Sequence, residues 1–183
     1  MTTPSKLLAL ILLQSSLTML IAETHRYPQP KEPASFCSVI DCGVDSPFQN
    51  APNPSHEVLQ ALLSQTEVRD ALQNSDRSRA AQLFKASTVH LGPSKETDLI
   101  ISGDCPLCGA DNNWFWVVRL TPRGPRVVLF AHTLRLDLLT NTTRGFRDIH
   151  CSWASAGSSL EEQYQFDGSQ YKLIKEERAA PHP

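Results

Sequence analysis

The sequence predicts an α+β domain in which an N-terminal pair of helices packs on a curved antiparallel β-meander of six or seven strands. Three observations predict this class: an apolar stripe of helical period after residue 55, alternation of period two from Asp98 onward, and short links between the alternating runs. Short links join antiparallel neighbours, because parallel strands need long crossovers. A single sheet covered by helices and a small sandwich both fit this pattern.

The first 22 residues are expected to be a secretory signal peptide. Lys6 is the only charge before an apolar segment that runs to Ala22, a small residue of the kind found before a cleavage site. The segment is short and diluted by hydroxyl residues, which makes it a poor membrane span. We therefore expect a secreted or periplasmic protein with no membrane association beyond the export signal. An uncleaved anchor is the alternative.

Residues 23–54 are expected to form a proline-rich arm ahead of the domain. Proline lacks an amide donor and disfavours helix in the residue before it, so the segment should be extended. It contains six of the thirteen prolines, namely Pro28, Pro30, Pro33, Pro47, Pro52 and Pro54.

The domain itself is expected over residues 55–175 and begins with the two helices. Ser55 is a suitable N-cap for the first helix. One helical stripe then carries the apolar side chains Val58, Leu59, Leu62, Leu63 and Leu72. The polar stretch "QNSDRS" interrupts the pattern, and a shorter helix from about Asp76 to Lys85 should follow.

The strands follow as one short apolar run, "DLIISG", and then as runs that are mostly alternating, separated by turn residues. In chain order the runs are "DLIISG", "NWFWVVRL", "RVVLFA", "TLRLDLL", "RDIHCSWAS" and "LEEQYQFDGSQYKLI". The last run predicts a hairpin with a type I′ turn at Asp167-Gly168. Its core-facing side chains should be Tyr164, Phe166, Tyr171 and Leu173. The charged tail, residues 176–183, should be frayed.

Five cysteines in an exported chain indicate disulfides. The favoured pairing joins Cys37 to Cys42 and Cys105 to Cys108, and leaves Cys151 buried and unpaired, because it alternates in phase with Ile149 and Trp153. The main rival joins Cys151 to Cys105 or Cys108.

The string "CPLC" also raises the hypothesis of a thiol–disulfide oxidoreductase that uses Cys105 and Cys108. Such an enzyme needs its attacking cysteine at a helix N-terminus, where the thiol pKa is lowered. A turn and a strand are expected after Cys108, which disfavours this chemistry. Zinc bound by Cys37, Cys42, Cys105 and Cys108 is disfavoured by the oxidising compartment, so no metal or other cofactor is predicted.

A few other residues are candidates for binding. Trp114 and Trp116 should lie in the core, but either would mark a recognition surface if it were exposed. Asp148 and His150 alternate onto one strand face, where they could support each other. The net charge of −2, with no concentrated basic patch, makes nucleic acid a poor candidate partner.

Three segments carry a resemblance over roughly residues 55 to 174: "VHLGPSKETDLIISGDCPLCGADNNWFWVVR", "RGFRDIHCSWAS" and "YQFDGSQYKL". They resemble an uncharacterised family of small secreted bacterial proteins with no named activity. The resemblance implies a calcium-type loop of pattern D-x-N-x-D-G ahead of the first long strand. His90, Gly92 and Ser94 stand at its ligand positions and only Asp98 keeps a carboxylate, so the loop is degenerate and no calcium is expected.

Because no catalytic constellation is visible, the sequence favours an exported, non-catalytic binding module of the cell envelope or extracellular space. A protein or a cell-envelope component would be its partner. The thiol–disulfide oxidoreductase is the alternative.

Overall fold

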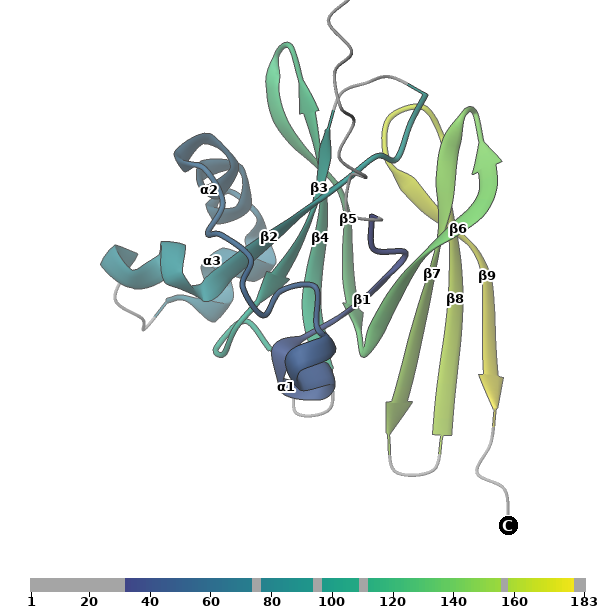
Figure 1. Ribbon diagram of the computed structural model, residues 1–183, viewed down its shortest axis with the longest axis horizontal. Helices are drawn as coiled ribbons and strands as arrows, with labels where there is room; N and C mark the ends of the chain where they lie inside the picture. The colour runs from purple at the N-terminus through teal and green to yellow at the C-terminus, as the bar shows by residue number, and fades with distance from the viewer. Residues whose placement is uncertain (1–31, 74–76, 94–96, 109–111, 156–157, 180–183) are drawn as a thin grey trace, which may run out of the picture. The chain divides into compact units, whose positions relative to one another are not determined.

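The alternating runs form strands that assemble into two antiparallel sheets (Figure 1). The computed structural model describes residues 32–73, 77–93, 97–108, 112–155 and 158–179. The expected signal peptide at residues 1–22 and its cleavage point at Ala22 lie outside these residues. Within the described residues, no helix is both long enough and apolar enough to cross a membrane.

The four-stranded sheet has the order β2-β3-β4-β5. Its strands are β2 (Phe84–Val89), β3 (Asp98–Gly103), β4 (Asn113–Thr121) and β5 (Gly124–Thr133). Every residue of β3 is buried, because this sheet is covered on both faces. The continuous apolar run "LII" in β3, which the sequence predicted as a short apolar strand, suits this doubly covered position.

The five-stranded sheet has the order β1-β6-β7-β8-β9. Its strands are β1 (Ser35–Cys37), β6 (Arg135–Thr143), β7 (Phe146–Ser155), β8 (Ser158–Phe166) and β9 (Tyr171–Ala179). Sequential strands from β6 to β9 pair as a meander.

The single meander predicted from the sequence is wrong, because the chain changes sheets between β5 and β6. Only Leu134 separates these strands, and a one-residue link is shorter than the loops that join hairpin strands. The corner is tied to β7 instead: the Leu134 amide and the Thr133 hydroxyl both donate to the Ser152 carbonyl, at 3.0 and 2.6 Å. Seven strands do follow Asp98, as expected, but they are divided between two sheets.

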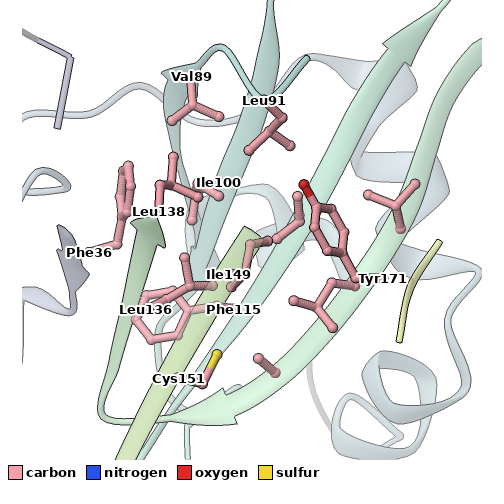
Figure 2. Packing of buried hydrophobic residues seen from close by; sticks show 14 of the residues in the cluster. Phe36, Val89, Leu91, Ile100, Phe115, Leu136, Leu138, Ile149, Cys151 and Tyr171 are labelled. Atoms are coloured by element: carbon pink, nitrogen blue, oxygen red, sulfur yellow. The ribbon is translucent and has the colours of Figure 1, made fainter. Parts of the chain in front are cut away.

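The facing sides of the two sheets enclose the larger core (Figure 2). Phe115 and Ile100 of the four-stranded sheet meet Leu136 and Ile149 of the five-stranded sheet, and all four are fully buried. Cys151 is also buried there, as its phase predicted.

Two short helices cover the other face of the four-stranded sheet (Figure 1). They are α2 (His56–Leu63) and α3 (Thr66–Ala71), followed by a 3₁₀ segment, η2 (Arg77–Leu83). Ser55 is the N-cap, as predicted, and its hydroxyl accepts from the Val58 amide at 3.4 Å. The apolar stripe of these helices packs on Trp116, which is fully buried.

The second helix predicted for residues 76–85 is wrong. Its first part is the 3₁₀ segment, and β2 begins at Phe84. Phe84, Ala86 and Val89 are buried along β2. The strand was mistaken for a helix because the spacing of these apolar residues also fits a helical stripe.

The described part of the expected arm belongs to the folded unit, which extends from Glu32 onward. β1 pairs with β6, and a short helix, α1 (Val39–Cys42), leads into a 3₁₀ turn, η1 (Gly43–Asp45). Phe36 and Phe48 enter the inter-sheet core, with their ring centroids 6.0 Å apart. The domain therefore does not begin at residue 55.

The last hairpin forms where the sequence predicted it, but with a longer loop. β8 and β9 are joined by Asp167–Gln170, and the Asp167 side chain accepts from the amides of Ser169 and Gln170. Those hydrogen bonds lower the pKa of Asp167 to about 2. Phe166 and Tyr171 are buried as expected, whereas Leu173 is 46% exposed.

A type I′ turn, which was predicted at Asp167-Gly168, requires positive φ at both central residues. This feature occurs instead between β6 and β7, at Arg144 and Gly145. β9 continues to Ala179, so fraying from residue 176 is also wrong, and residues 180–183 lie outside the described part.

Candidate binding cleft between the two sheets

A cleft opens where β8 and β9 extend beyond the cover of the four-stranded sheet. Along β8, Glu162 lies next to Cys151 of β7 and Tyr164 lies next to Ile149, so these side chains face the same side as the inter-sheet core. Phe166 closes that row at the buried end, whereas the residues from Ser159 to Gln165 are only partly buried. The inner face of β8 is thus apolar and closed at one end and polar and open at the other.

The inter-sheet cleft has a volume of about 400 Å³, which is within the range of small-molecule sites. The four-stranded sheet contributes Asn112, just before β4, and His132 of β5. The five-stranded sheet contributes Trp153, Leu160, Glu162 and Arg178, with the small residues Ser158 and Ser159 beside them.

Asn112 carries an unsatisfied acceptor behind the wall of this cleft. The residue is 6% exposed, and its Oδ1 atom has no hydrogen-bond partner in the described part of the chain. A buried polar atom without a partner costs roughly 1–3 kcal/mol. The Oδ1 atom has almost no accessible surface, so a ligand in the cleft would not reach it.

Glu162 is the acidic group of the cleft. The Tyr164 hydroxyl donates to its Oε2 atom at 2.9 Å, and no ion pair to Glu162 occurs among the described residues. The nearest strand neighbour with positive charge, Arg178, pairs with Glu176 instead, at 2.9 Å. Burial and then this hydrogen bond raise the pKa of Tyr164, so the hydroxyl stays protonated and keeps donating to the carboxylate.

Aromatic side chains line the rest of the cleft and its border. Trp153 is partly exposed on the wall, and His132 is exposed at the edge. The His132 ring lies against Trp114 with the centroids 6.2 Å apart, and Trp114 in turn contacts Phe130 at 5.3 Å. These rings meet edge to face, and Trp114 and Phe130 pack against the helix-side core, so this aromatic row lies on the other face of the four-stranded sheet from the inter-sheet core.

Of the two tryptophans proposed for binding, only Trp114 has an accessible surface. Trp116 is fully buried between Phe84 and Phe130, and its indole N–H points to Glu67 Oε1 at 3.4 Å. Trp116 is therefore a core residue, as the sequence predicted, and not part of a recognition surface. Trp153, which the sequence placed in the core, lines the cleft.

Asp148 and His150 do not support each other. Asp148 is 2% exposed and accepts from Gln165 at 3.1 Å. His150 lies instead between Asp137 of β6 and Glu161 of β8, with nitrogen–oxygen distances of 3.6 and 2.7 Å. This row crosses the outer face of the five-stranded sheet, away from the cleft.

The structure joins Cys105 to Cys108 and Cys37 to Cys42 by disulfide bonds, the pairing that the sequence favours. Cys105 is exposed. Cys108 forms a β-bridge with Asn113, where β4 begins. A strand therefore follows the two cysteines, and the described residues after Cys108 do not include the helix N-terminus that a redox site requires. The disulfide holds a tight turn that inserts Leu107, which is fully buried, under Trp116.

The remaining sulfur, that of Cys151, forms no disulfide and is buried. Burial raises its pKa, and the nearby charges of Glu162 and Asp137 raise it further. The four sulfurs of the suggested zinc site are taken up in disulfides, and no cluster of three possible metal ligands occurs within the described ranges.

A second cleft of similar volume lies at the start of α2, between Pro54 and the β4–β5 hairpin. Its wall is formed mainly by apolar groups such as Val58, Leu99 and Leu120. The inter-sheet cleft is the stronger candidate, because it combines a carboxylate, that of Glu162, with an aromatic side chain, Trp153, on its wall.

No family model, curated protein or solved structure matches this chain. The chemistry of the site must therefore follow from its own geometry. Sequence reasoning missed Asn112, Glu162 and Arg178. A signal for Glu162 was present: it is in phase with Tyr164 and Phe166, and a carboxylate on a core-facing position is unusual.

Proposed function

We propose that this chain is an exported, non-catalytic binding protein whose ligand occupies the inter-sheet cleft. The observation that carries the proposal is a cavity of about 400 Å³ that presents the Glu162 carboxylate, which has no ion pair among the described residues, beside the partly exposed Trp153. Pockets with a few convergent polar groups on an apolar wall are the usual form of a ligand site.

Export is supported by two features. The first 22 residues have the pattern of a secretory signal, and two disulfides are typical of chains that fold in an oxidising compartment. The proposed location is the periplasm, the cell envelope or the extracellular space. Alkaline phosphatase fused behind the whole chain should be active, and the same fusion without residues 1–22 should not.

Ligand binding can be tested at Trp153 while the ligand is still unidentified. The chain has three tryptophans, so 5-fluorotryptophan gives three ¹⁹F resonances, which Trp→Phe variants assign. The intact protein is screened with amines, carboxylates, alcohols, sugars and short peptides. We expect at least one class to shift Trp153 and leave the buried Trp116 unchanged.

Ser159→Arg, which places a large side chain in the cleft, should abolish that shift. The matched control is Ser169→Arg in the exposed β8–β9 loop, which should preserve it. The proposal is wrong if no class shifts Trp153, or if Ser159→Arg leaves the shift intact.

A further inference from the structure

The polar groups of the inter-sheet cleft point to a particular ligand chemistry, an inference that rests on the proposed function. Glu162 presents its carboxylate, a hydrogen-bond acceptor, to the cleft. A ligand that fits this group must supply a donor.

The charge of the cleft favours a cation among the possible donors. Glu162 lies on the inner side of the sheet without an ion pair in the described part of the chain, and the hydrogen bond that it accepts there comes from a neutral hydroxyl. Arg178 is engaged by Glu176, so Glu162 keeps its negative charge uncompensated. A hydrogen bond between a carboxylate and a protonated amine is about twice as strong as one between neutral groups.

The walls of the cleft favour an apolar body attached to that cation. Trp153 and Leu160 are adjacent across β7 and β8 and both line the cavity. Aromatic faces attract ammonium groups and also pack against hydrocarbon. A volume of about 400 Å³ leaves room for such a body beside the polar groups.

We infer that the inter-sheet cleft binds a protonated primary amine carried on an apolar group, with the Glu162 carboxylate accepting from the ammonium and Trp153 packing on the apolar part. The same chemistry is presented by a small free amine and by the N-terminus of a peptide that begins with an apolar residue. The experiment therefore includes both sources.

Isothermal titration calorimetry of the intact protein uses 2-phenylethylamine as the probe, with 2-phenylethanol and phenylacetate as neutral and anionic analogues. We expect the amine to bind at least about tenfold more tightly than either analogue, which is the usual loss for a missing hydrogen bond to a charged group. The peptide Phe-Gly-Gly, with a free or an acetylated N-terminus, distinguishes the sources. Binding of the free peptide, and not of the acetylated one, assigns the site to peptide N-termini.

Glu162→Gln should weaken binding of the amine by about tenfold or more. Glu161→Gln is the matched control, because Glu161 is the adjacent residue on the opposite face of β8, where it contacts His150. It should leave amine binding unchanged, and near-ultraviolet circular dichroism should show that both variants are folded.

Equal or tighter binding of 2-phenylethanol or phenylacetate overturns the inference, and so does an equal effect of the two glutamine variants. Absence of amine binding overturns it as well. None of these results affects the proposed function if another compound class still shifts the Trp153 resonance and Ser159→Arg abolishes that shift. The two ideas therefore fail separately.

Discussion

Gly103, at the end of β3, shows how close the packing is around the "CPLC" turn. A Cβ atom at this position would lie 2.6 Å from the Leu107 carbonyl oxygen and 2.8 Å from the Leu107 Cβ. Both are positions fixed by the backbone of the turn, which is held by the Cys105–Cys108 disulfide. Glycine is required at position 103 because a side chain there would collide with Leu107, and not because of an unusual backbone conformation.

We therefore expect Gly103→Ala to destabilise the protein by about 1–3 kcal/mol, as other over-packed sites do. Thermal unfolding followed by circular dichroism should show a melting temperature lower by several degrees. An unchanged melting temperature would contradict the close approach of Leu107.

Cys151 gives the protein a defined sensitivity to alkali. Its pKa is raised above the ordinary value of 9.0, mainly by burial. Below that pH the folded and the unfolded chain both hold the proton, and the thiol adds no pH dependence. Above it only the unfolded chain loses the proton, so the free energy of unfolding decreases as the pH rises.

The contribution of this one thiol should be a loss of about 1.4 kcal/mol at pH 10, one unit above its ordinary value. Cys151→Ala removes this contribution, and the cavity that it creates costs the same at each pH. Urea unfolding of both proteins at pH 8 and pH 10 measures the difference. Parallel losses of stability in the two proteins would show that the thiol ionises normally in the folded state.

At the scale of elements, the strand that follows Cys108 decides the chemistry of the "CPLC" turn. Without a helix dipole behind the thiols, reduced Cys105 lacks the stabilisation that makes a cysteine a good attacking group. The protein should not accelerate the reduction of insulin by dithiothreitol. The oxidoreductase hypothesis would be supported if acceleration occurred and was lost in Cys105→Ser.

The same disulfide should contribute to stability through the short loop that it closes. Removing both thiols, in Cys105→Ser with Cys108→Ser, should cost about 2 kcal/mol by the loop-entropy relation. Urea unfolding measures this cost. A variant as stable as the original protein would mean that the packing of Leu107 alone holds the turn.

The sequence predicted elements well where one physical signal dominated. Ser55 caps α2, the alternating runs after Asp98 are strands, and Cys151 is buried, because capping, alternation and phase are local properties. Phe84–Val89 was misassigned, since an apolar residue every second or third position suits either a helix or a strand. β1 was missed because three residues carry no periodic signal, and its position depends on pairing with β6, a hundred residues away.

The cleft could be predicted only in part, for a related reason. Alternation places Glu162 on the core side of β8, but the point at which the other sheet stops covering it depends on the β5–β6 corner. That corner is set by one residue, Leu134, and by hydrogen bonds to Ser152. Asn112 approaches the cleft only through this tertiary arrangement, whereas Arg178 is brought near Glu162 by the local pairing of β8 with β9.

At the scale of the whole molecule, the four-stranded sheet is shared by two cores. The helices pack on one of its faces and the five-stranded sheet on the other. Val117 and Trp116, consecutive in β4, belong to different cores. Neither core can be lost without exposing a face of the common sheet, so the described residues should unfold as one cooperative unit.

The fluorotryptophan-labelled protein tests this expectation directly. Trp116 reports on the helix-side core and Trp153 on the five-stranded sheet. Their native resonances should disappear over the same range of urea concentration, as two-state unfolding requires. Separate midpoints would mean that the five-stranded sheet can detach while the helices remain packed.

β9 ends the five-stranded sheet, and no strand in the described ranges pairs with its outer side. An open edge of nine residues could recruit strands from other molecules and start fibrils. Here charges of both signs, on Lys172, Lys175, Glu176, Glu177 and Arg178, follow the edge and surround the exposed Leu173 and Ile174. The edge beside the inter-sheet cleft thus carries charges that oppose self-association, and engineering that neutralises these charges would risk precipitation of the protein.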